Sequence, residues 1–187
     1  NILISKLPGI PMAESLRTRY MAEAKFLRAY FYFDLVRLFE NIPLMDKPLT
    51  AEEIYDVVQA DPALVYELII ADLKEAINGL PATVPVETEG GRATAGAARA
   101  LLGRAYLQIG EYALAAEQLA EVNGTPGGTS QYGYSLLPDY DDLWDFDNKH
   151  NSESIFTVNH TGEANWDNWW CIACAEGNWL NRMTATK

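Results

Sequence analysis

The stretch RALLGRAYLQIGEY, Arg99–Tyr112, decides the fold of this chain. Its apolar residues, among them Leu101 and Ala105, recur at the spacing of one face of a helix. Gly103 lies in the middle of this predicted helix, where a glycine costs roughly 0.5–1 kcal/mol relative to alanine. The absence of a side chain lets a neighbouring helix approach closely, and the closer packing offsets that cost. The stretch therefore predicts a second helix packed against Gly103.

The same residues match the tetratricopeptide repeat, a unit of two antiparallel helices. Its pattern has Leu-Gly, a Tyr three residues later, a turn Gly, a second Tyr, a small residue and a large apolar residue. The chain supplies all of these in order and spacing, at Leu102, Gly103, Tyr106, Gly110, Tyr112, Ala115 and Leu119. Arg99 stands where the pattern has an early Trp. Any antiparallel helix pair is the alternative interpretation.

Helix-capping residues mark the other elements. A long helix is predicted over Met12–Phe39, ending before Pro43. A second begins with Asp61 as cap and Pro62 at its first position, and ends at Asn78-Gly79 before Pro81. A third, capped by Thr94, covers Ala95–Ile109, and a fourth covers Tyr112–Val122.

These elements predict an all-α fold of tetratricopeptide-like antiparallel helix pairs with a loop-rich appendage and about one short strand. The strand is expected in SIFTVNH, with Phe156 and Val158 on its buried face. Residues 1–125 form the predicted helical region, and residues 126–187 a loop-rich, aromatic segment of the same domain. The first two predicted helices match the repeat pattern less completely. Leu73, Ala76 and Pro81 have the spacing of its last apolar, alanine and proline positions.

Composition excludes several classes of partner. The 187 residues carry a formal net charge of −12, which repels the phosphates of nucleic acids and of anionic lipids. No run of 18 apolar residues exists, so no membrane-spanning segment is predicted. The chain has only two cysteines, too few to indicate a disulfide framework or a redox compartment.

The segment AEAKFLRAYFYFDLVRLFENIPL resembles the signature of the SusD/RagB-like proteins. The matching residues are Glu23, Ala24, Phe26, Leu27, Arg28, Ala29, Tyr32, Leu35, Val36, Leu38, Phe39, Pro43 and Leu44. The later segments VYELIIADLKEAINGLP, GRATAGAARALLGRAYLQIGEY, YSLLPDYDDLW and NSESIFTV follow in the order of the family's landmarks. The resemblance covers roughly residues 1–160.

The resemblance implies a nutrient-binding outer-membrane lipoprotein of Bacteroidetes-type bacteria. Such a protein lies on the cell surface, caps a SusC-like TonB-dependent transporter, and holds an oligosaccharide or another nutrient for import. The rival interpretation is a tetratricopeptide scaffold that binds protein segments in its groove. Neither function involves catalysis, a cofactor or a resident metal.

The chain departs from the family pattern in three places. Glu40 replaces the usual glycine after Leu-Phe, which puts the local turn in doubt. The lipid-bearing N-terminal cysteine and the large C-terminal half of the family are absent, so we interpret the chain as an internal fragment. A fragment is expected to leave part of the apolar face of Met12–Phe39 uncovered.

Two motifs invite metal or redox hypotheses. Cys171 and Cys174 have the spacing of half a zinc site or of a redox dithiol, but a local disulfide or two packed thiols is the favoured interpretation. The acidic run Asp139, Asp141, Asp142, Asp145 and Asp147 suggests calcium. It lacks the mid-loop glycine and the final glutamate of an EF-hand, which favours a solvated acidic loop.

No catalytic constellation is found in the sequence. There is no GxSxG, phosphate-binding loop or HExxH motif. Glu23 and Asp34 lie in the first long helix, where carboxylates are expected to form structural ion pairs.

Tryptophans are the candidate ligand contacts. Indole stacks on the apolar C–H face of a sugar ring, and neighbouring amides bond its hydroxyls. A local hydrophobic cluster, or a surface that the missing half covers, is the alternative. The predicted binding residues are Trp166, Trp169, Trp170, Trp179 and Asn168, within a segment where Asn165, Asp167 and Asn178 are interleaved.

Overall fold

The structure is a computed structural model that describes residues 1–145, 148 and 150–158. Residues 1–156 form one compact unit. Its helices are α1 (Ile2–Lys6), α2 (Glu14–Phe39), α3 (Pro62–Gly79), α4 (Val86–Glu89), α5 (Ala95–Gln108) and α6 (Tyr112–Asn123). Single 3₁₀ turns cover Leu7–Gly9 (η1), Glu53–Asp56 (η2) and Asp141–Trp144 (η3).

The predicted all-α fold is confirmed, and the capping residues account for the helix starts. The Asp61 carboxylate accepts a hydrogen bond from the backbone N–H of Ala63 at 2.8 Å, and Pro62 occupies the first position of α3. The Thr94 hydroxyl accepts from the N–H of Ala97 at 3.2 Å at the start of α5. Each side chain satisfies one of the N–H groups that a helix start leaves without a partner.

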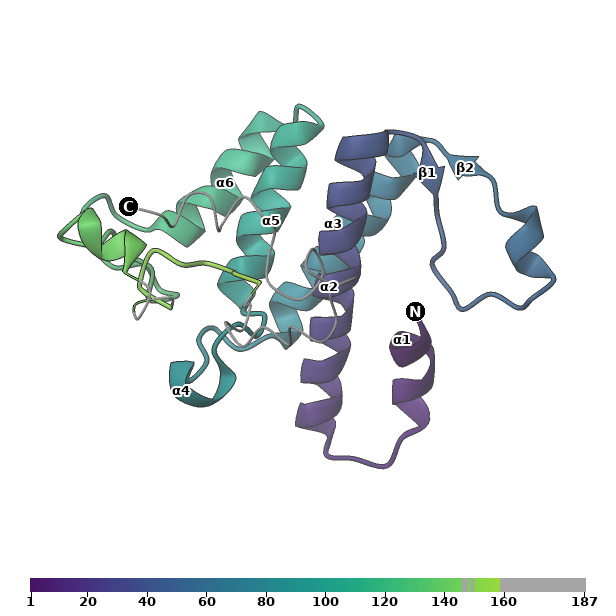
Figure 1. Cartoon of the computed structure of the whole chain (residues 1–187), viewed down its shortest axis with the longest axis horizontal. Coiled ribbons are helices and arrows are strands. Elements are labelled where there is room, and N and C mark those ends of the chain that lie inside the picture. Colours follow the sequence, from purple (N-terminus) through teal and green to yellow (C-terminus); the bar gives the residue numbers. More distant parts are fainter. Residues whose placement is uncertain (146–147, 149, 159–187) are drawn as a thin grey trace, which may run out of the picture. The chain divides into compact units, whose positions relative to one another are not determined.

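The helices form a series in which α2 packs on α3, α3 on α5, and α5 on α6 (Figure 1). The two helices run antiparallel in the pair α2 and α3 and in the pair α5 and α6. Each pair therefore buries the apolar faces that its two helices turn toward each other. The core along this series consists of fully buried side chains, including Phe26, Ile69, Leu73, Ala98 and Leu102.

Gly103 lies at the contact between α5 and α6, as predicted. A Cβ atom at this position would lie 2.7 Å from Cγ and from Cδ2 of Leu119, which is closer than real Cβ contacts come. Gly110 then reverses the chain with a φ of +84°. The N–H groups of Gly110 and Glu111 cap α5 by donating to the carbonyls of Leu107 and Tyr106.

Gly79 ends α3, as predicted, and also has a role in packing. It is the last residue of α3, and its φ is not positive. A Cβ atom there would lie 2.8 Å from Cβ of Ala22 in α2. Gly79 is therefore small because α2 passes close to it, as Gly103 is small because of α6.

The strand prediction is corrected in its position. Residues 154–158 form no strand, and the described part of the chain has one antiparallel pair, β1 (Ile42–Pro43) with β2 (Gln59–Ala60). Phe156 does face the core, with its ring centroid 4.9 Å from that of Phe26, whereas Val158 is exposed. Among the described residues, no neighbouring strand completes a ladder beside residues 154–158, so their alternating pattern remains unpaired.

A buried ion pair fastens α2 to α3 and to the chain that follows α2. Arg28 donates from Nε and Nη2 to the two carboxylate oxygens of Asp72, at 2.7 and 2.8 Å, and Asp72 is 2% exposed. Nη1 of Arg28 donates to the carbonyl of Asp46 at 2.8 Å. The Tyr32 hydroxyl accepts from the N–H of Met45 and donates to its carbonyl.

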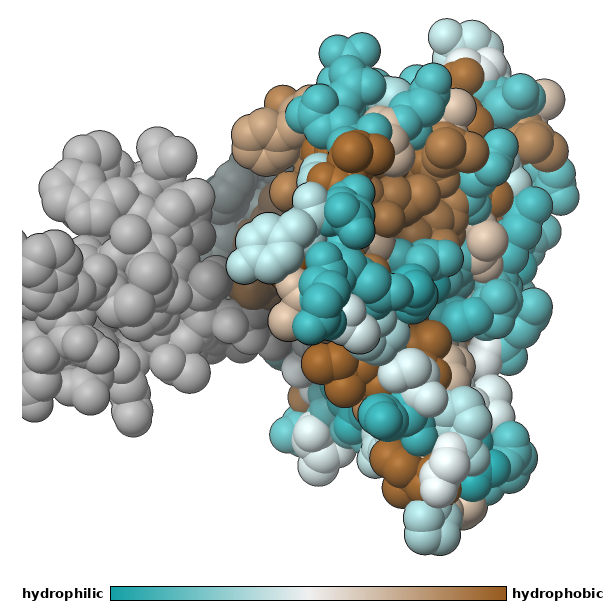
Figure 2. Space-filling model, turned by 90° about the vertical axis from the view of Figure 1, so that its right-hand side faces the viewer, coloured by the Kyte–Doolittle hydropathy of each residue, from teal (hydrophilic) through white to brown (hydrophobic). Residues whose placement is uncertain are grey.

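An adjoining face of α2 is left partly uncovered, as expected. Its exposed apolar side chains follow helical spacing: Leu27, Phe31, Leu35 and Leu38. With Leu3 of α1 and Ala24, three of them line a groove of about 370 Å³. Figure 2 shows apolar surface lying open among hydrophilic side chains on one face of the molecule. Within the described residues, no helix combines the length and apolar character needed to cross a membrane.

Candidate functional site

The segment that follows α6 folds back along the start of α5. A Cβ atom at Gly96, in the first turn of α5, would lie 2.6 Å from Cε2 of Tyr134 and 2.8 Å from Cγ of Tyr132. The two tyrosine rings therefore lie directly on the helix backbone. Their position requires the glycine, because any side chain there would displace them.

Hydrogen bonds fix both tyrosines. The Tyr132 hydroxyl accepts from Nε of Arg99 at 2.9 Å, and Nη1 of Arg99 donates to Gln118 of α6 at 3.1 Å. Arg99, which replaces the Trp of the repeat pattern, thus joins both helices to the segment after them. The Tyr134 hydroxyl lies 3.0 Å from Oγ1 of Thr94. Burial raises the pKa of Tyr134, against the opposite effect of the Thr94 hydrogen bond, so the phenol stays protonated at neutral pH.

The turn before these tyrosines is built on a buried serine. Oγ of Ser130 accepts from the N–H groups of Tyr132 at 3.3 Å and Tyr134 at 3.2 Å. Gly124, with a φ of +65°, ends α6, and a Cβ atom there would lie 3.0 Å from Cα of Ser130. The close approach of the two backbones explains the glycine at position 124, whereas Gly127 meets nothing within 4 Å and is favoured by its φ of +77°.

The end of α6 and the chain that follows it line a cavity of about 610 Å³. Its lining includes the apolar side chains of Val122, Leu136 and Ile155 and the hydroxyl-bearing residues Thr125 and Thr129. The complete lining is residues 122–129, 134–136, 152, 153 and 155. A lining that combines apolar side chains with a few polar groups is the usual composition of a small-molecule site.

The far wall of the cavity is held by two adjacent stretches of chain. The N–H of Ser135 donates to the carbonyl of Ser152 at 3.0 Å, and Oγ of Ser152 donates back to the carbonyl of Ser135 at 2.9 Å. The Glu153 carboxylate accepts from the N–H of Leu137 at 2.7 Å. These bonds hold the two stretches together, and the Glu153 carboxylate keeps further acceptor capacity that could serve a hydroxyl group.

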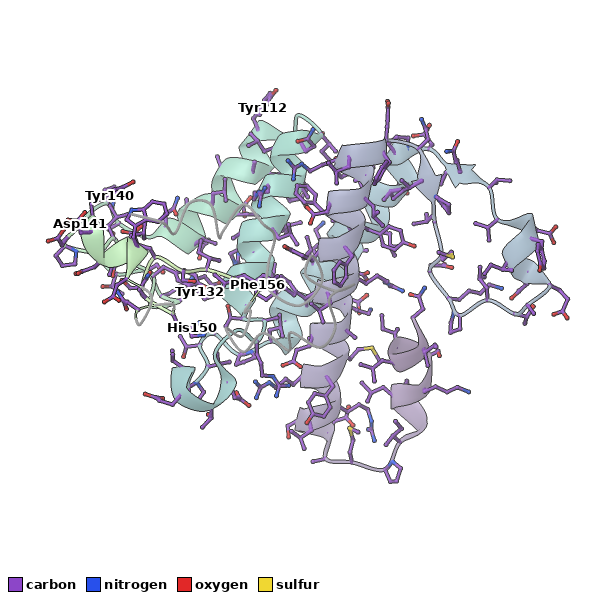
Figure 3. The ribbon with its side chains drawn as sticks, in the orientation of Figure 1. Tyr112, Tyr132, Tyr140, Asp141, His150 and Phe156 are labelled. Atoms are coloured by element: carbon purple, nitrogen blue, oxygen red, sulfur yellow. The ribbon has the colours of Figure 1, made fainter. Side chains whose placement is uncertain are left out.

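An exposed aromatic pair lies at η3. Tyr140 and Trp144 are 72% and 71% exposed, with ring centroids 6.2 Å apart and ring planes at 67°. Figure 3 shows Tyr140 and Asp141 at the outer end of the segment, whereas Tyr132 and Phe156 lie nearer the helices. Sequence reasoning missed this pair, although a Tyr and a Trp four residues apart between aspartates was a usable signal.

The binding residues predicted from the sequence are not among those that the structure describes. Trp166, Trp169, Trp170, Trp179 and Asn168 lie outside the described residues, as do Cys171 and Cys174. Asp147 of the acidic run also lies outside them. Among the described residues, no three His, Cys, Asp or Glu side chains come together as a metal site would require.

The expected structural ion pairs of α2 are confirmed. Glu23 accepts from Nε of Arg19 at 3.1 Å and from Nη2 of Arg92 at 2.7 Å. Asp34 pairs with Arg37 at 3.7 Å. Both carboxylates serve the scaffold.

Comparisons with known proteins agree on one family. Residues 2–107 match the SusD-like family model described as starch-binding and associating with the outer membrane. SusD-like protein P25 of Formosa agariphila is 27% identical over 197 aligned residues, which cover 100% of this chain and 36% of that protein.

Two solved structures extend this agreement to the fold. A laminarin-binding SusD-like protein is 51% identical, with a TM-score of 0.86 over 90% of this chain and 37% of the other. A SusD-like carbohydrate-binding protein of Bacteroides fragilis is 28% identical, with a TM-score of 0.73 over 84% and 30%. The chain thus spans about a third of the length of each of these relatives.

Proposed function

The chain belongs to the SusD-like family, and from this premise we propose that it is the part of a cell-surface binding protein that helps to capture a glycan for import. Capture takes place without cleavage of the glycan. The protein is anchored to the outer membrane by lipid and hands its ligand to a SusC-like TonB-dependent transporter. The family description, which names starch binding and association with the outer membrane, supports this location.

The observation that carries the proposal is the likeness to the laminarin-binding protein. An identity of 51% with a TM-score of 0.86 over 90% of the chain supports a shared ligand class. A β-linked glucan is therefore the first candidate ligand.

The cavity beside α6 suits such a ligand. Sugar rings have apolar C–H faces and a rim of hydroxyls, which complement the apolar and polar groups of this lining. Leu136 and Ile155 would contact the ring faces, and the Glu153 carboxylate would accept from hydroxyls while still bonded to Leu137. We propose Trp166, Trp169, Trp170, Trp179 and Asn168 as further sugar contacts.

Isothermal titration calorimetry of the chain with laminarihexaose tests this function. Thr129 is exposed and lines the cavity. Thr129→Trp should fill the cavity and weaken binding. Lys74→Trp, on the exposed side of α3, is the matched control and should bind like wild type. Chromatography of the incubated sugar should show no shorter products.

Two outcomes would count against the proposal. Cleavage of the hexasaccharide would replace capture by catalysis. Failure of wild type to bind laminarihexaose or maltohexaose, with capture of peptides in a pull-down, would favour the tetratricopeptide scaffold alternative.

A further inference from the structure

Large aromatic rings that are mostly exposed need an explanation when two of them lie together. Burying an aromatic side chain stabilises a protein, and exposed apolar patches mark interaction sites. Tyr140 and Trp144 leave 72% and 71% of their surface open, whereas the nearby Tyr132 is buried. The pair therefore contributes little to the core, and its exposure points to a contact with another molecule.

Hydrogen bonds of the backbone close the turn that carries the pair. The N–H of Leu143 donates to the carbonyl of Tyr140 at 3.2 Å, which closes the 3₁₀ turn between the rings. The Asp139 carboxylate accepts from the N–H of Asp141 at 3.0 Å, and Nδ2 of Asn148 donates to the carbonyl of Asp142 at 3.2 Å. A surface that is ordered before binding loses less entropy when a ligand arrives.

The geometry of the rings suits a sugar. Their planes meet at 67° with centroids 6.2 Å apart, so the two rings do not stack face to face on each other. The face of an aromatic ring is negative and attracts the weakly positive C–H groups of a pyranose ring. The exposed carboxylates of Asp141 and Asp142 lie on the same turn and can accept hydrogen bonds from hydroxyls.

We propose that Tyr140 and Trp144 form a second sugar-stacking surface, which holds a neutral glycan at a subsite separate from the cavity. Neither residue lines the cavity. A chain of several sugar units could thus contact the protein at two places, which raises the overall affinity by effective concentration. This inference rests on the proposed glycan-binding function.

Calorimetry with laminarihexaose and maltohexaose on the chain of residues 1–187 is the test. Each of Tyr140→Ala and Trp144→Ala should raise the Kd for the bound sugar at least about fivefold, because aromatic stacking on a ring ligand carries energy of that order. Trp144→Tyr keeps an aromatic face and should recover most of the affinity. Tyr112→Ala removes an equally exposed ring at the start of α6 and should leave the Kd unchanged.

A second measurement avoids dependence on variant folding. The indole N–H signal of Trp144, assigned by its loss in Trp144→Phe, should shift in the NMR spectrum of wild type as sugar is added. An unmoved signal together with unchanged Kd values would overturn the second subsite while leaving the glycan-binding function intact. No binding of either sugar by wild type would overturn both.

Discussion

Gly103 in α5 faces Leu119 in α6 so closely that a Cβ atom on the glycine would lie 2.7 Å from Cγ of the leucine. This contact fixes the distance between the two helices. We expect Gly103→Leu to destabilise the protein by about 1–3 kcal/mol, as overpacking does. Urea unfolding followed by circular dichroism measures the change. Gly9→Ala is the control, because a Cβ atom there meets nothing within 4 Å; equal effects of both would remove the packing role of Gly103.

Glu40 makes a turn that suits glycine. It ends α2 with a φ of +61° and a ψ of −84°, and it is the one non-glycine residue with positive φ in the described part of the chain. A Cβ atom in this region is strained by about 1–3 kcal/mol. Glu40→Gly should therefore raise the free energy of unfolding by about 1 kcal/mol, after the glycine's greater unfolded-state entropy is subtracted.

Glu52→Gly is the control for this substitution. Glu52 has an ordinary φ of −78°, so glycine there removes no strain and should lower stability slightly. A melting temperature lowered alike by both substitutions would show that Glu40 is not strained.

Arg28 and Asp72 form a buried ion pair. Removing either side chain leaves the charge of the other buried without a partner. We expect Arg28→Ala to cost about 3–5 kcal/mol, as the removal of one partner of a buried ion pair does. The double variant Arg28→Met with Asp72→Leu should cost less than the single variant. Denaturant titration measures both losses.

The exposed pair of Arg37 and Asp34 supplies the comparison. Its atoms lie 3.7 Å apart near the surface, so Arg37→Ala should change stability by only about 0–1 kcal/mol. A similar loss from both arginine substitutions would contradict the special role of Arg28.

Glu89 holds α4 to α2 through charge. Its carboxylate accepts from Arg19 at 2.7 Å, and this hydrogen bond lowers the pKa of Glu89 below its ordinary value. A lowered folded-state pKa means that the stabilisation is present above the unfolded pKa and is lost as pH falls through the folded pKa. Wild type should thus be more stable than Glu89→Gln at pH 7, and the difference should vanish at acidic pH.

Thermal melts from about pH 7 to about pH 3, a range that spans the ordinary carboxyl pKa, test this dependence. Glu87→Gln, on the same short helix but outside the ion pairs of the described residues, should show no such difference. A gap between wild type and Glu89→Gln that stays constant over the whole range would show that the carboxylate charge is not responsible.

Phe26 and Phe31 distinguish the covered from the open face of α2. Phe26 is 1% exposed and Phe31 is 60% exposed. Phe26→Ala should cost about 3–5 kcal/mol, whereas Phe31→Ala should cost well under about 1 kcal/mol. Chemical denaturation separates them, and a large loss from Phe31→Ala would show that its face is covered in solution.

The sequence by itself determined the four long helices and the contact of α5 with α6 at Gly103, but it did not predict the short helices α1 and α4. Asp61 and Thr94 cap their helices through bonds to residues two or three positions away, so short-range chemistry was sufficient to place those ends. Gly103 was interpretable because its whole repeat pattern lies within some twenty residues. The binding residues predicted from Trp166 onward remain predictions.

Only the tertiary structure decided the roles that depend on distant parts of the chain. Gly79 is small because Ala22 passes beside it, and Gly96 is small because Tyr132 and Tyr134 lie on it. The exposure of Tyr140 and Trp144 likewise depends on what packs around them, since the same apolar rings would suit a core. The local sequence indicates whether a side chain is apolar, aromatic or small. Long-range packing determines whether that side chain is buried or exposed.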